Sequence, residues 1–383
     1  MLKFCKVWFI LGTMTLGSVA SAQELPPGNP FTPPPQRTYQ PYRPSRSYRP
    51  YRPRRSTTYG RHAPKPPKQY SYRPFDITPV YPLSIFHPQH KVIIGLSVNG
   101  LYGRNTSVYG LELGALVNHN IENMGGIQIA GLANWSGGSV TGLQLSGIIN
   151  YSGGAGFGIA ISTINWHHSF TGFQIGAVNY TAKRFKGVQL SPLVNINSGD
   201  GSGLQLSLFN RLEGSFTGIQ LGAVNEVVRN FSGFQVSLFN NVYRDFSGIQ
   251  IGIFMNMNHI KLGPKSCSGT RCTQEVTTYY NNFTGISISP FGNMAYNMKG
   301  VQLSPLMNLV KNRMSGLQAG LLNVADELSG VQLGVLNFAS HVSGMQIGAL
   351  NAAKTLDGVQ IGVLNIAYKN WLPIMVGINV GGF

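Results

Sequence analysis

The hydrophobic and polar residues of this chain follow one short pattern that returns from residue 110 to residue 367. The motif reads Gly-h-Gln-h-(Gly/Ser)-x-h-Asn, where h is aliphatic or Phe. Hydrophobic residues alternate with Gln and Gly, and a period of two residues is typical of a β-strand. The copies begin at Gly110, Gly126, Gly142, Gly158, Gly172, Gly187, Gly203, Gly218, Gly233, Gly248, Gly285, Gly300, Gly316, Gly330, Gly344 and Gly358.

The spacing of these leading glycines is nearly constant. The period is about 14–16 residues, which is short and regular enough to indicate a repeat architecture. The one exception is the long step between Gly248 and Gly285. Gly95 begins a degenerate candidate for a further copy. About five polar residues join one copy to the next, and no stretch of ten residues has a helical period. We therefore predict an all-β repeat body.

The architecture that fits best is a β-solenoid of about 16 coils of about 14–16 residues each. Equivalent positions would stack in parallel, about 4.8 Å apart, and Gln or Asn side chains would bond to their counterparts in the next coil. The Gln positions expected to line up are Gln174, Gln189, Gln205, Gln220, Gln235, Gln250, Gln332, Gln346 and Gln360.

The alternative is an outer-membrane β-barrel with one copy per strand. Flanking strands near residues 91–101 and 373–383 would bring the number to about 18, and the chain ends in Phe383, similar to the assembly signal of such barrels. Barrel strands alternate in direction and alternate short turns with long loops. Here every copy has the same phase and a similar link, which favours the solenoid.

The N-terminus has the pattern of a secretory signal peptide. Lys3 and Lys6 precede an apolar stretch over residues 7–16, and Ala20-Ser21-Ala22 provides a small-residue cleavage site. We predict a signal peptide over residues 1–22 and a mature chain that begins at Gln23, outside the cytoplasm.

Residues 23–76 form a basic tract rich in Pro, Tyr and Arg. They contain eleven Lys or Arg and two acids, a net charge of +9 out of the formal +17 of the chain. Proline fixes φ and lacks an amide donor, so an extended, disordered segment is expected. It acts either as a charged spacer or as a ligand for lipopolysaccharide, anionic wall polymers or extracellular DNA. The candidate polyanion-binding residues are Arg43, Arg49, Arg52, Arg54 and Arg55.

The long step in the array marks an insertion in the repeat domain, which we place at residues 77–383. The inserted loop, 256–282, contains Cys267 and Cys272, the only cysteines after signal cleavage. In an oxidising compartment this pair is expected to form a disulfide. A zinc site with His259 is the rival, but no second ligand pair exists. The loop is the best single candidate for contact with a partner.

Candidate chemistry is otherwise sparse. Charged residues make up 11% of the chain, and residues 77–383 contain ten acids, mostly in links. No Ser/His/Asp grouping, paired carboxylates or metal-spaced cluster can be traced, and His167-His168 is expected to lie in a link. No apolar run of about 18 residues, the length that a spanning helix needs, follows the N-terminus, so no transmembrane helix is predicted. We predict neither a catalytic site nor a cofactor.

The last three copies look like known repeats. Gln332 to Ala339, Gln346 to Ala353 and Gln360 to Ala367 resemble the Q-x-G-x-x-N-x-A core of curlin repeats, although curlin repeats are longer and more polar. The whole array, 110–367, resembles more closely the surface-repeat proteins of spirochaetes and related Gram-negative bacteria. That resemblance implies an outer-envelope location. The departures from curlin repeats favour a closed, monomeric stack over an amyloid fibre.

These observations together predict an exported, non-enzymatic structural or adhesion protein of the cell surface or outer envelope. The alternative is a porin-like barrel. Expected partners are an envelope or anionic polymer surface, or a host or matrix surface, with no sequence-specific nucleic acid.

Overall fold

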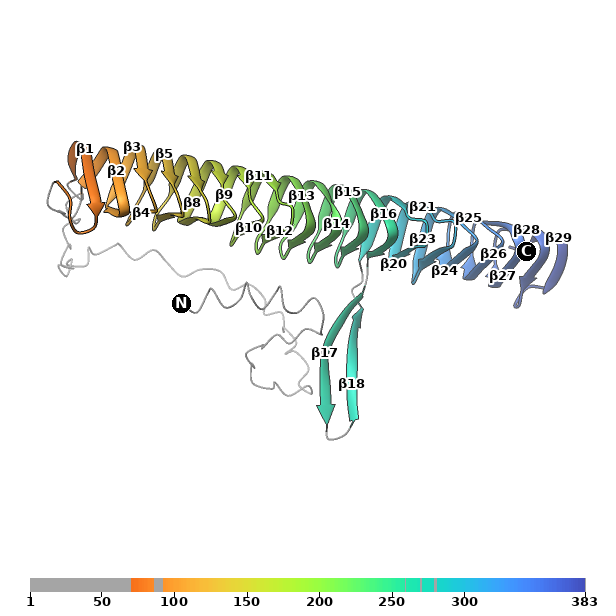
Figure 1. Ribbon diagram of the computed structural model, residues 1–383. Coiled ribbons are helices and arrows are strands. Elements are labelled where there is room, and N and C mark those ends of the chain that lie inside the picture. Colours follow the sequence, from red (N-terminus) through yellow and green to blue (C-terminus); the bar gives the residue numbers. More distant parts are fainter. Residues whose placement is uncertain (1–69, 86–91, 259, 269–270, 279–280, 383) are drawn as a thin grey trace, which may run out of the picture. The chain divides into compact units, whose positions relative to one another are not determined.

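The structure is a computed structural model that describes residues 70–382, except 86–91, 259, 269–270 and 279–280. The described residues form 29 strands and no helix. Most strands pair in parallel with strands one coil away, and the array makes about 17 turns (Figure 1). The predicted β-solenoid is therefore confirmed. The alternative barrel is wrong, because consecutive copies run in the same direction.

The strand bounds follow the repeat. The strands are β1 (Ser71–Val80), β2 (Val92–Asn105), β3 (Ser107–Gly114), β4 (Val117–Asn120), β5 (Met124–Ala130), β6 (Ala133–Ser136), β7 (Val140–Ser146), β8 (Ile149–Ile161), β9 (Ile164–Ile175), β10 (Val178–Thr181), β11 (Phe185–Leu190), β12 (Val194–Asn197), β13 (Gly201–Leu212), β14 (Phe216–Val227), β15 (Phe231–Val242), β16 (Phe246–Asn258), β17 (Ile260–Ser268), β18 (Arg271–Thr278), β19 (Asn282–Ile288), β20 (Gly292–Ala295), β21 (Asn297–Leu303), β22 (Met307–Val310), β23 (Arg313–Ala319), β24 (Leu322–Leu328), β25 (Val331–Leu333), β26 (Leu336–Val342), β27 (Met345–Leu356), β28 (Val359–Ala367) and β29 (Ile374–Val380).

A typical coil contains two strand segments joined at a corner. In the coil of β11 and β12, the corner contains Pro192. Proline has no backbone N–H to donate, and at a corner outside the strands no ladder hydrogen bond is lost. Both segments pair in register with the next coil, so that Gln189 lies opposite Gln205 and Asn195 lies opposite Asn210. In β14 and β15 the two segments merge into one bent strand.

The leading glycine of each copy is required by the backbone. At Gly218, for example, φ is 139°, a region that L-residues rarely adopt. A Cβ atom at this position would also overlap the carbonyl oxygen of Gly203 in the preceding coil. The glycines therefore let adjacent coils approach at the point where the chain enters each Gln-bearing segment.

The apolar part of the interior is concentrated in the C-terminal coils. One continuous core runs from Leu212 to Ala367. It contains a stack of phenylalanine rings, in which Phe231 and Phe246 have centroids 5.3 Å apart. In the N-terminal coils, the inward position that Leu212 occupies in its coil is taken by polar residues: Asn105, Asn120, Ser136, Ser152, His167, Thr181 and Asn197.

Each end of the array is closed by an additional strand. At the N-terminal end, β1 pairs in parallel with β2, and Asp76 is buried opposite Ser97. This corrects the expected extent of the disordered tract, since residues 71–76 belong to the sheet. Pro74 is compatible with β1 because edge strands tolerate missing donors. At the other end, β29 pairs antiparallel with β28.

The insertion leaves the array in register. β16 pairs directly with β19 and β20, so that Gly248 lies opposite Gly285 and Asn256 opposite Asn293. The rings of Phe246 and Phe283 stack with centroids 4.4 Å apart. The insertion begins after Asn258 rather than at residue 256, because residues 256–258 still pair with β20.

The inserted segment contains its own two-stranded sheet, β17 and β18. Cys267 lies in β17 and Cys272 in β18. The expected disulfide concerns side chains that fall outside the described part of the structure, and it stays a prediction.

Deleting residues 259–279 is expected to leave the solenoid folded. The deletion gives Gly285 the same separation along the chain from Gly248 that Gly126 has from Gly110, which is a normal coil length. The coils on both sides already pair, so the free energy of unfolding should change by no more than about 1 kcal/mol. Thermal unfolding followed by circular dichroism provides the measurement.

The matched control is a deletion of equal length inside the array, residues 204–224. It removes one coil and part of the next, and thereby shifts the register of every following side chain. This control should lose β structure. If both deletion variants lost β structure to the same extent, the insertion would be shown to be part of the fold.

Candidate functional site

The predicted Gln residues form a hydrogen-bonded ladder inside the solenoid. All nine of the predicted Gln residues are fully buried. Where two consecutive coils both contain a Gln, the Nε2 of the later Gln donates to the Oε1 of the earlier one. The distance is 2.6 Å from Gln189 to Gln174 and 2.7 Å from Gln205 to Gln189. The same bonds link Gln332, Gln346 and Gln360, each at 2.8 Å.

A second ladder of Asn residues runs through every coil in the opposite direction. The Nδ2 of each Asn donates to the Oδ1 of the Asn in the following coil, from Asn99 to Asn365, at 2.8–3.1 Å. In most coils the second hydrogen of the same Nδ2 reaches a backbone carbonyl; that of Asn195 reaches Leu206, for example. The Asn ladder therefore hydrogen-bonds to the backbone of neighbouring coils as well as to itself, and it continues across the insertion.

The N-terminal end of the Gln ladder is an acid, Glu112. This residue lies in the Gln position of the first regular copy and is fully buried. Its Oε1 accepts from Asn99 and Asn105, and its Oε2 accepts from Asn120 and Gln128, at 2.7–3.2 Å. Burial raises the pKa of Glu112, and these four amide donors act to lower it. A carboxyl group suits this end, because its two oxygens accept from four amides and the Gln amides of the ladder donate towards it.

His167 carries the ladder across a coil that has no Gln. In that coil Ala160 occupies the Gln position. The Nε2 of Gln174 donates to Nδ1 of His167 at 2.8 Å, and Nε2 of His167 lies 3.2 Å from Oε1 of Gln144, to which it donates. His167 lies inside β9 rather than in a link, which corrects the expectation from the sequence. Burial lowers its pKa to about 3, so the ring is neutral at physiological pH.

The Gln ladder is interrupted at the insertion and closed at its C-terminal end. At the insertion, Ser287 replaces Gln, and the Oε1 of Gln250 accepts instead from Asn258 at 2.8 Å. At the C-terminal end, Asn379 of β29 donates to the Oε1 of Gln360 at 3.2 Å. The last acceptor of the ladder is thus satisfied by the capping strand.

The outer surface of the solenoid has one apolar edge, which we call the apolar ridge. It consists of three rows: the residue after each leading Gly, the residue after each Gln position, and the corner residue two before each Asn. The rows are Leu111, Ile127, Leu143, Ile159, Phe173, Val188, Leu204, Ile219, Phe234, Ile249, Ile286, Val301, Leu317, Val331, Met345 and Val359; Leu113, Ile129, Leu145, Ile161, Ile175, Leu190, Leu206, Leu221, Val236, Ile251, Ile288, Leu303, Ala319, Leu333, Ile347 and Ile361; and Leu116, Leu132, Ile148, Thr163, Ala177, Leu193, Leu208, Ala223, Leu238, Phe254, Phe291, Leu306, Leu321, Val335, Ala349 and Val363.

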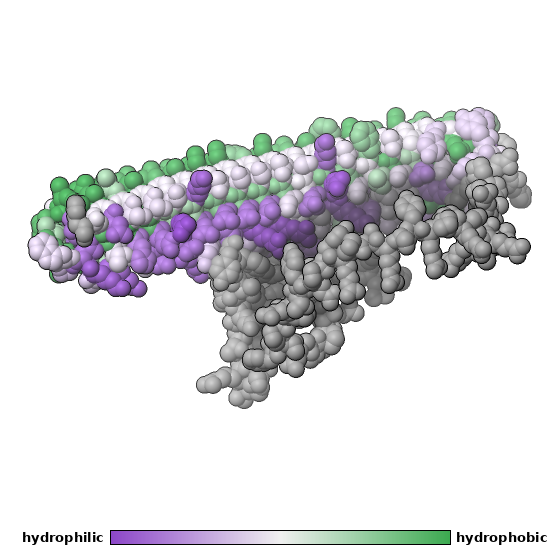
Figure 2. All heavy atoms as spheres, turned by 180° about the vertical axis from the view of Figure 1, so that it is seen from behind, coloured by the Kyte–Doolittle hydropathy of each residue, from purple (hydrophilic) through white to green (hydrophobic). Residues whose placement is uncertain are grey.

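No member of the apolar ridge is buried and none is charged. The corner row is the most exposed, with Leu193 at 48%, Phe291 at 50% and Val363 at 71%. Figure 2 shows this hydrophobic edge along the whole array, with hydrophilic residues along the opposite edge. The strand β29 extends the ridge, because Ile374, Val376, Ile378 and Val380 are also exposed.

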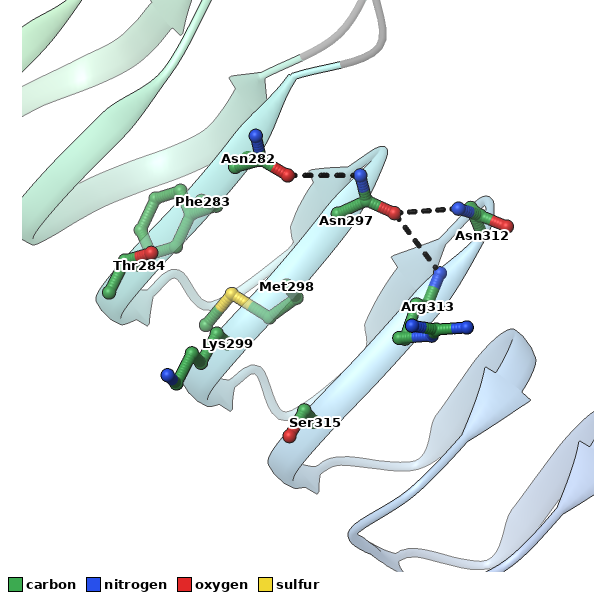
Figure 3. A pocket seen from close by; sticks show the side chains of 9 residues that line it. All are labelled: Asn282, Phe283, Thr284, Asn297, Met298, Lys299, Asn312, Arg313 and Ser315. Atoms are coloured by element: carbon green, nitrogen blue, oxygen red, sulfur yellow. Dashed lines mark hydrogen bonds between the residues drawn. The ribbon is translucent and has the colours of Figure 1, made fainter.

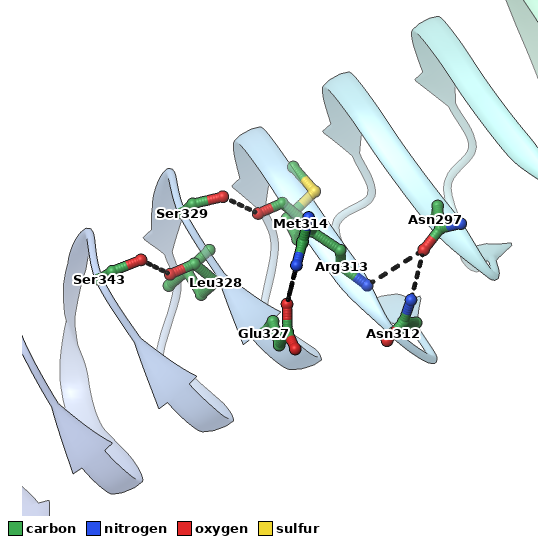
Figure 4. A network of polar contacts seen from close by, with 8 residues as sticks. All are labelled: Asn297, Asn312, Arg313, Met314, Glu327, Leu328, Ser329 and Ser343. Atoms are coloured by element: carbon green, nitrogen blue, oxygen red, sulfur yellow. Dashed lines mark hydrogen bonds and ion pairs between the residues drawn. The ribbon is translucent and has the colours of Figure 1, made fainter.

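The charged and polar residues gather at the links between coils. Arg313 pairs with Glu327 at 2.7 Å, beside a surface row in which Asn312 donates to Asn297 at 2.7 Å (Figure 4). Asn297, Asn312 and Arg313 line a shallow hollow of about 590 Å³ between neighbouring coils (Figure 3). Exposed ion pairs of this kind contribute at most about 1 kcal/mol each, so the links are not what holds the coils together.

The other predicted site residues are not placed. Arg43, Arg49, Arg52, Arg54 and Arg55 lie outside the described residues. Within the described residues, no group of three or more His, Cys, Asp or Glu side chains could hold a metal ion. In that same part of the chain, no helix is long and apolar enough to span a membrane.

Sequence reasoning missed Glu112, His167 and the apolar ridge. Aligning the copies gives a signal for the first two, since Glu112 and Ala160 stand where Gln is expected. The ridge could not be recognised from the sequence, because the alternation of hydrophobic and polar residues defines two faces of a strand without showing which face points inward.

Comparison with known proteins does not assign this chain to a family. No protein-family model, curated protein or solved structure matches this chain.

The pair of Ala160 and His167 should be exchangeable only together. His167→Ala would leave the Oε1 of Gln144 and the Nε2 of Gln174 without partners in the interior and should lower the free energy of unfolding by about 2–4 kcal/mol. Ala160→Gln alone should also destabilise, because the new side chain would overlap the imidazole. The double variant Ala160→Gln/His167→Ser restores a regular ladder and should recover most of the loss. Urea unfolding of the three variants provides the test, and a double variant no better than His167→Ala would contradict the ladder.

The stability contributed by His167 should depend on pH. Its pKa is about 3 in the folded chain and about 6.5 when unfolded, so the unfolded state binds the proton first. Its contribution is complete above pH 6.5 and falls as the pH decreases. Between pH 7.5 and pH 5 the loss should be about 2 kcal/mol. The measurement is the difference in unfolding free energy between the natural chain and Ala160→Gln/His167→Ser at each pH, and a constant difference would contradict it.

Proposed function

We propose that this chain is an exported, non-enzymatic structural or adhesion element of the outer envelope or cell surface. One observation carries the proposal: the Asn ladder links every coil from Asn99 to Asn365 without interruption. A stack held from within is a rigid rod, and by strand spacing about 17 turns extend over roughly 80 Å.

The division between interior and surface supports such a role. Because buried Gln, Asn and Phe residues hold the coils together, the links are free to vary in sequence. They range from Ala182-Lys183-Arg184 to Ser198-Gly199-Asp200 without a change in the pairing of the coils beside them. The rod therefore presents similar surface positions at every coil, an arrangement that favours multivalent contact.

The basic tract fits the same role as an arm for anionic polymers. Lipopolysaccharide or wall polymers offer phosphates and carboxylates that Arg binds with paired donors. In this proposal Arg43, Arg49 and the arginines up to Arg55 contact the envelope, and the rod extends from them.

Export is tested by the mature N-terminus. Produced in a Gram-negative host, the chain should lose residues 1–22, begin at Gln23 and appear in the envelope or outside the cell. Intact mass measurement with fractionation and protease treatment of whole cells gives the answer. Leu11→Arg, which places a charge in the apolar stretch, is the matched control and should keep the full-length chain inside. A natural chain that retains Met1 in the cytoplasm would refute the proposal.

A further inference from the structure

The apolar ridge is too large to be an ordinary surface feature. Its three rows follow the array for roughly 80 Å and cover a width of about 15 Å, which gives an apolar area on the order of 1,200 Å². Soluble monomers rarely expose apolar patches above a few hundred Å². A surface of this size without a charged residue requires an apolar environment or partner.

The backbone beneath the ridge is already satisfied. Each strand segment is bonded to the coils on both sides, and the corners are bonded in the same way. The N–H of Leu132 donates to the carbonyl of Leu116, and the N–H of Ile148 donates to that of Leu132, both at 2.9 Å. Backbone in contact with hydrocarbon must have its hydrogen bonds made internally, and this surface meets that condition.

The shape of the ridge favours a fluid partner over a second copy. The row after Gln lies on one strand segment and the corner row lies at the turn that follows, so the apolar surface bends around an edge. Two such convex edges would touch along little more than one row, well below the roughly 800 Å² per partner that a stable dimer needs. The ridge also offers almost no side-chain donors or acceptors, whereas protein interfaces contain about one hydrogen bond per 100–200 Å².

The flanks of the ridge carry groups suited to the boundary of a bilayer. Lys186 and Lys299 lie one residue before a leading glycine, beside the first ridge row, and both are exposed. Their charge is complementary to headgroup phosphates, and residues 77–383 carry a net charge of +6 (16 − 10). Beside the corner, Trp135 stacks on Tyr151 with centroids 4.0 Å apart, and Trp and Tyr favour membrane interfaces.

The ridge also contains a groove. Ile175, Leu190, Leu206 and Leu221 line a hollow of about 760 Å³ around Pro192. Its lining is almost entirely aliphatic, so a flexible acyl chain can fill it without an unmet hydrogen bond.

We propose that the apolar ridge docks lengthwise on a lipid bilayer, with its corner row in the acyl-chain region and its flanks among the headgroups. Docking on a bilayer deepens the proposed function. It rests on that function only for the identity of the membrane, which would be the outer envelope. The inserted depth would be that of an interfacial element, about 5–10 Å, and the links would face water.

The test is flotation of the mature chain, residues 23–383, with phosphatidylcholine vesicles that contain either no anionic lipid or about 20% phosphatidylglycerol. The chain should float with both kinds of vesicle, and still do so in 1 M NaCl, because apolar insertion is not screened by salt. Leu206→Glu/Val236→Glu places two charges on the ridge and should reduce the partition coefficient at least tenfold.

The matched control uses the same two coils. Ser198→Glu/Asn230→Glu adds the same charges in the links that lead into β13 and β15, which face water in this proposal, and should change partitioning less than threefold. Circular dichroism must show all chains folded. These vesicle results do not depend on export, so they can fail while the mature N-terminus is found as proposed, and the reverse.

Two results would overturn the proposal. Binding that disappears in 1 M NaCl and is unaffected by Leu206→Glu/Val236→Glu would assign it to the basic tract. If the chain does not bind vesicles but sediments as a dimer, and the Leu206→Glu/Val236→Glu variant sediments as a monomer, a second copy of the chain covers the ridge.

Discussion

The structure depends on one constraint, the need to satisfy side-chain amides inside a narrow coil. A buried amide without a partner costs about 1–3 kcal/mol, whereas each completed hydrogen bond contributes about 1 kcal/mol. In most coils, stacking at the strand spacing places Gln next to Gln and Asn next to Asn. Repetition of sequence therefore makes the interior self-complementary, and a change of register would leave whole rows of amides unpaired.

The two ladders run in opposite directions, and this explains their ends. Gln side chains donate towards the N-terminus and Asn side chains donate towards the C-terminus. The N-terminal end of the Gln ladder is consequently the carboxyl group of Glu112, which accepts from Gln128, and the Oε1 of Gln360 at the other end accepts from Asn379 of β29. The Asn ladder ends on the carbonyl of Gly377, also in β29. The capping strand thus completes both ladders.

Placing amides inside leaves the aliphatic residues outside. In an ordinary soluble sheet the apolar side of the alternation is buried, but here Gln220 is fully buried while Ile219 is 42% exposed. The interior hydrogen bonds give the rod its stability without that burial, and the apolar ridge remains available for a partner. The Phe stack and the C-terminal core supply apolar burial on the other inward rows.

The sequence by itself determined the repeat, the β class, the coil length and the alignment of Gln with Gln, because these follow from the nearly constant step between leading glycines. Only the tertiary structure decided which side of the alternation faces inward, since a period of two defines two faces and names neither. It also decided that residues 71–76 join the sheet as β1, because an edge strand accommodates Pro74. The tertiary structure also decided that Ala160 and His167 together take the place of one Gln. These two residues lie seven apart in the chain, and they form one step of the ladder only when the coil closes and their side chains share the same interior space.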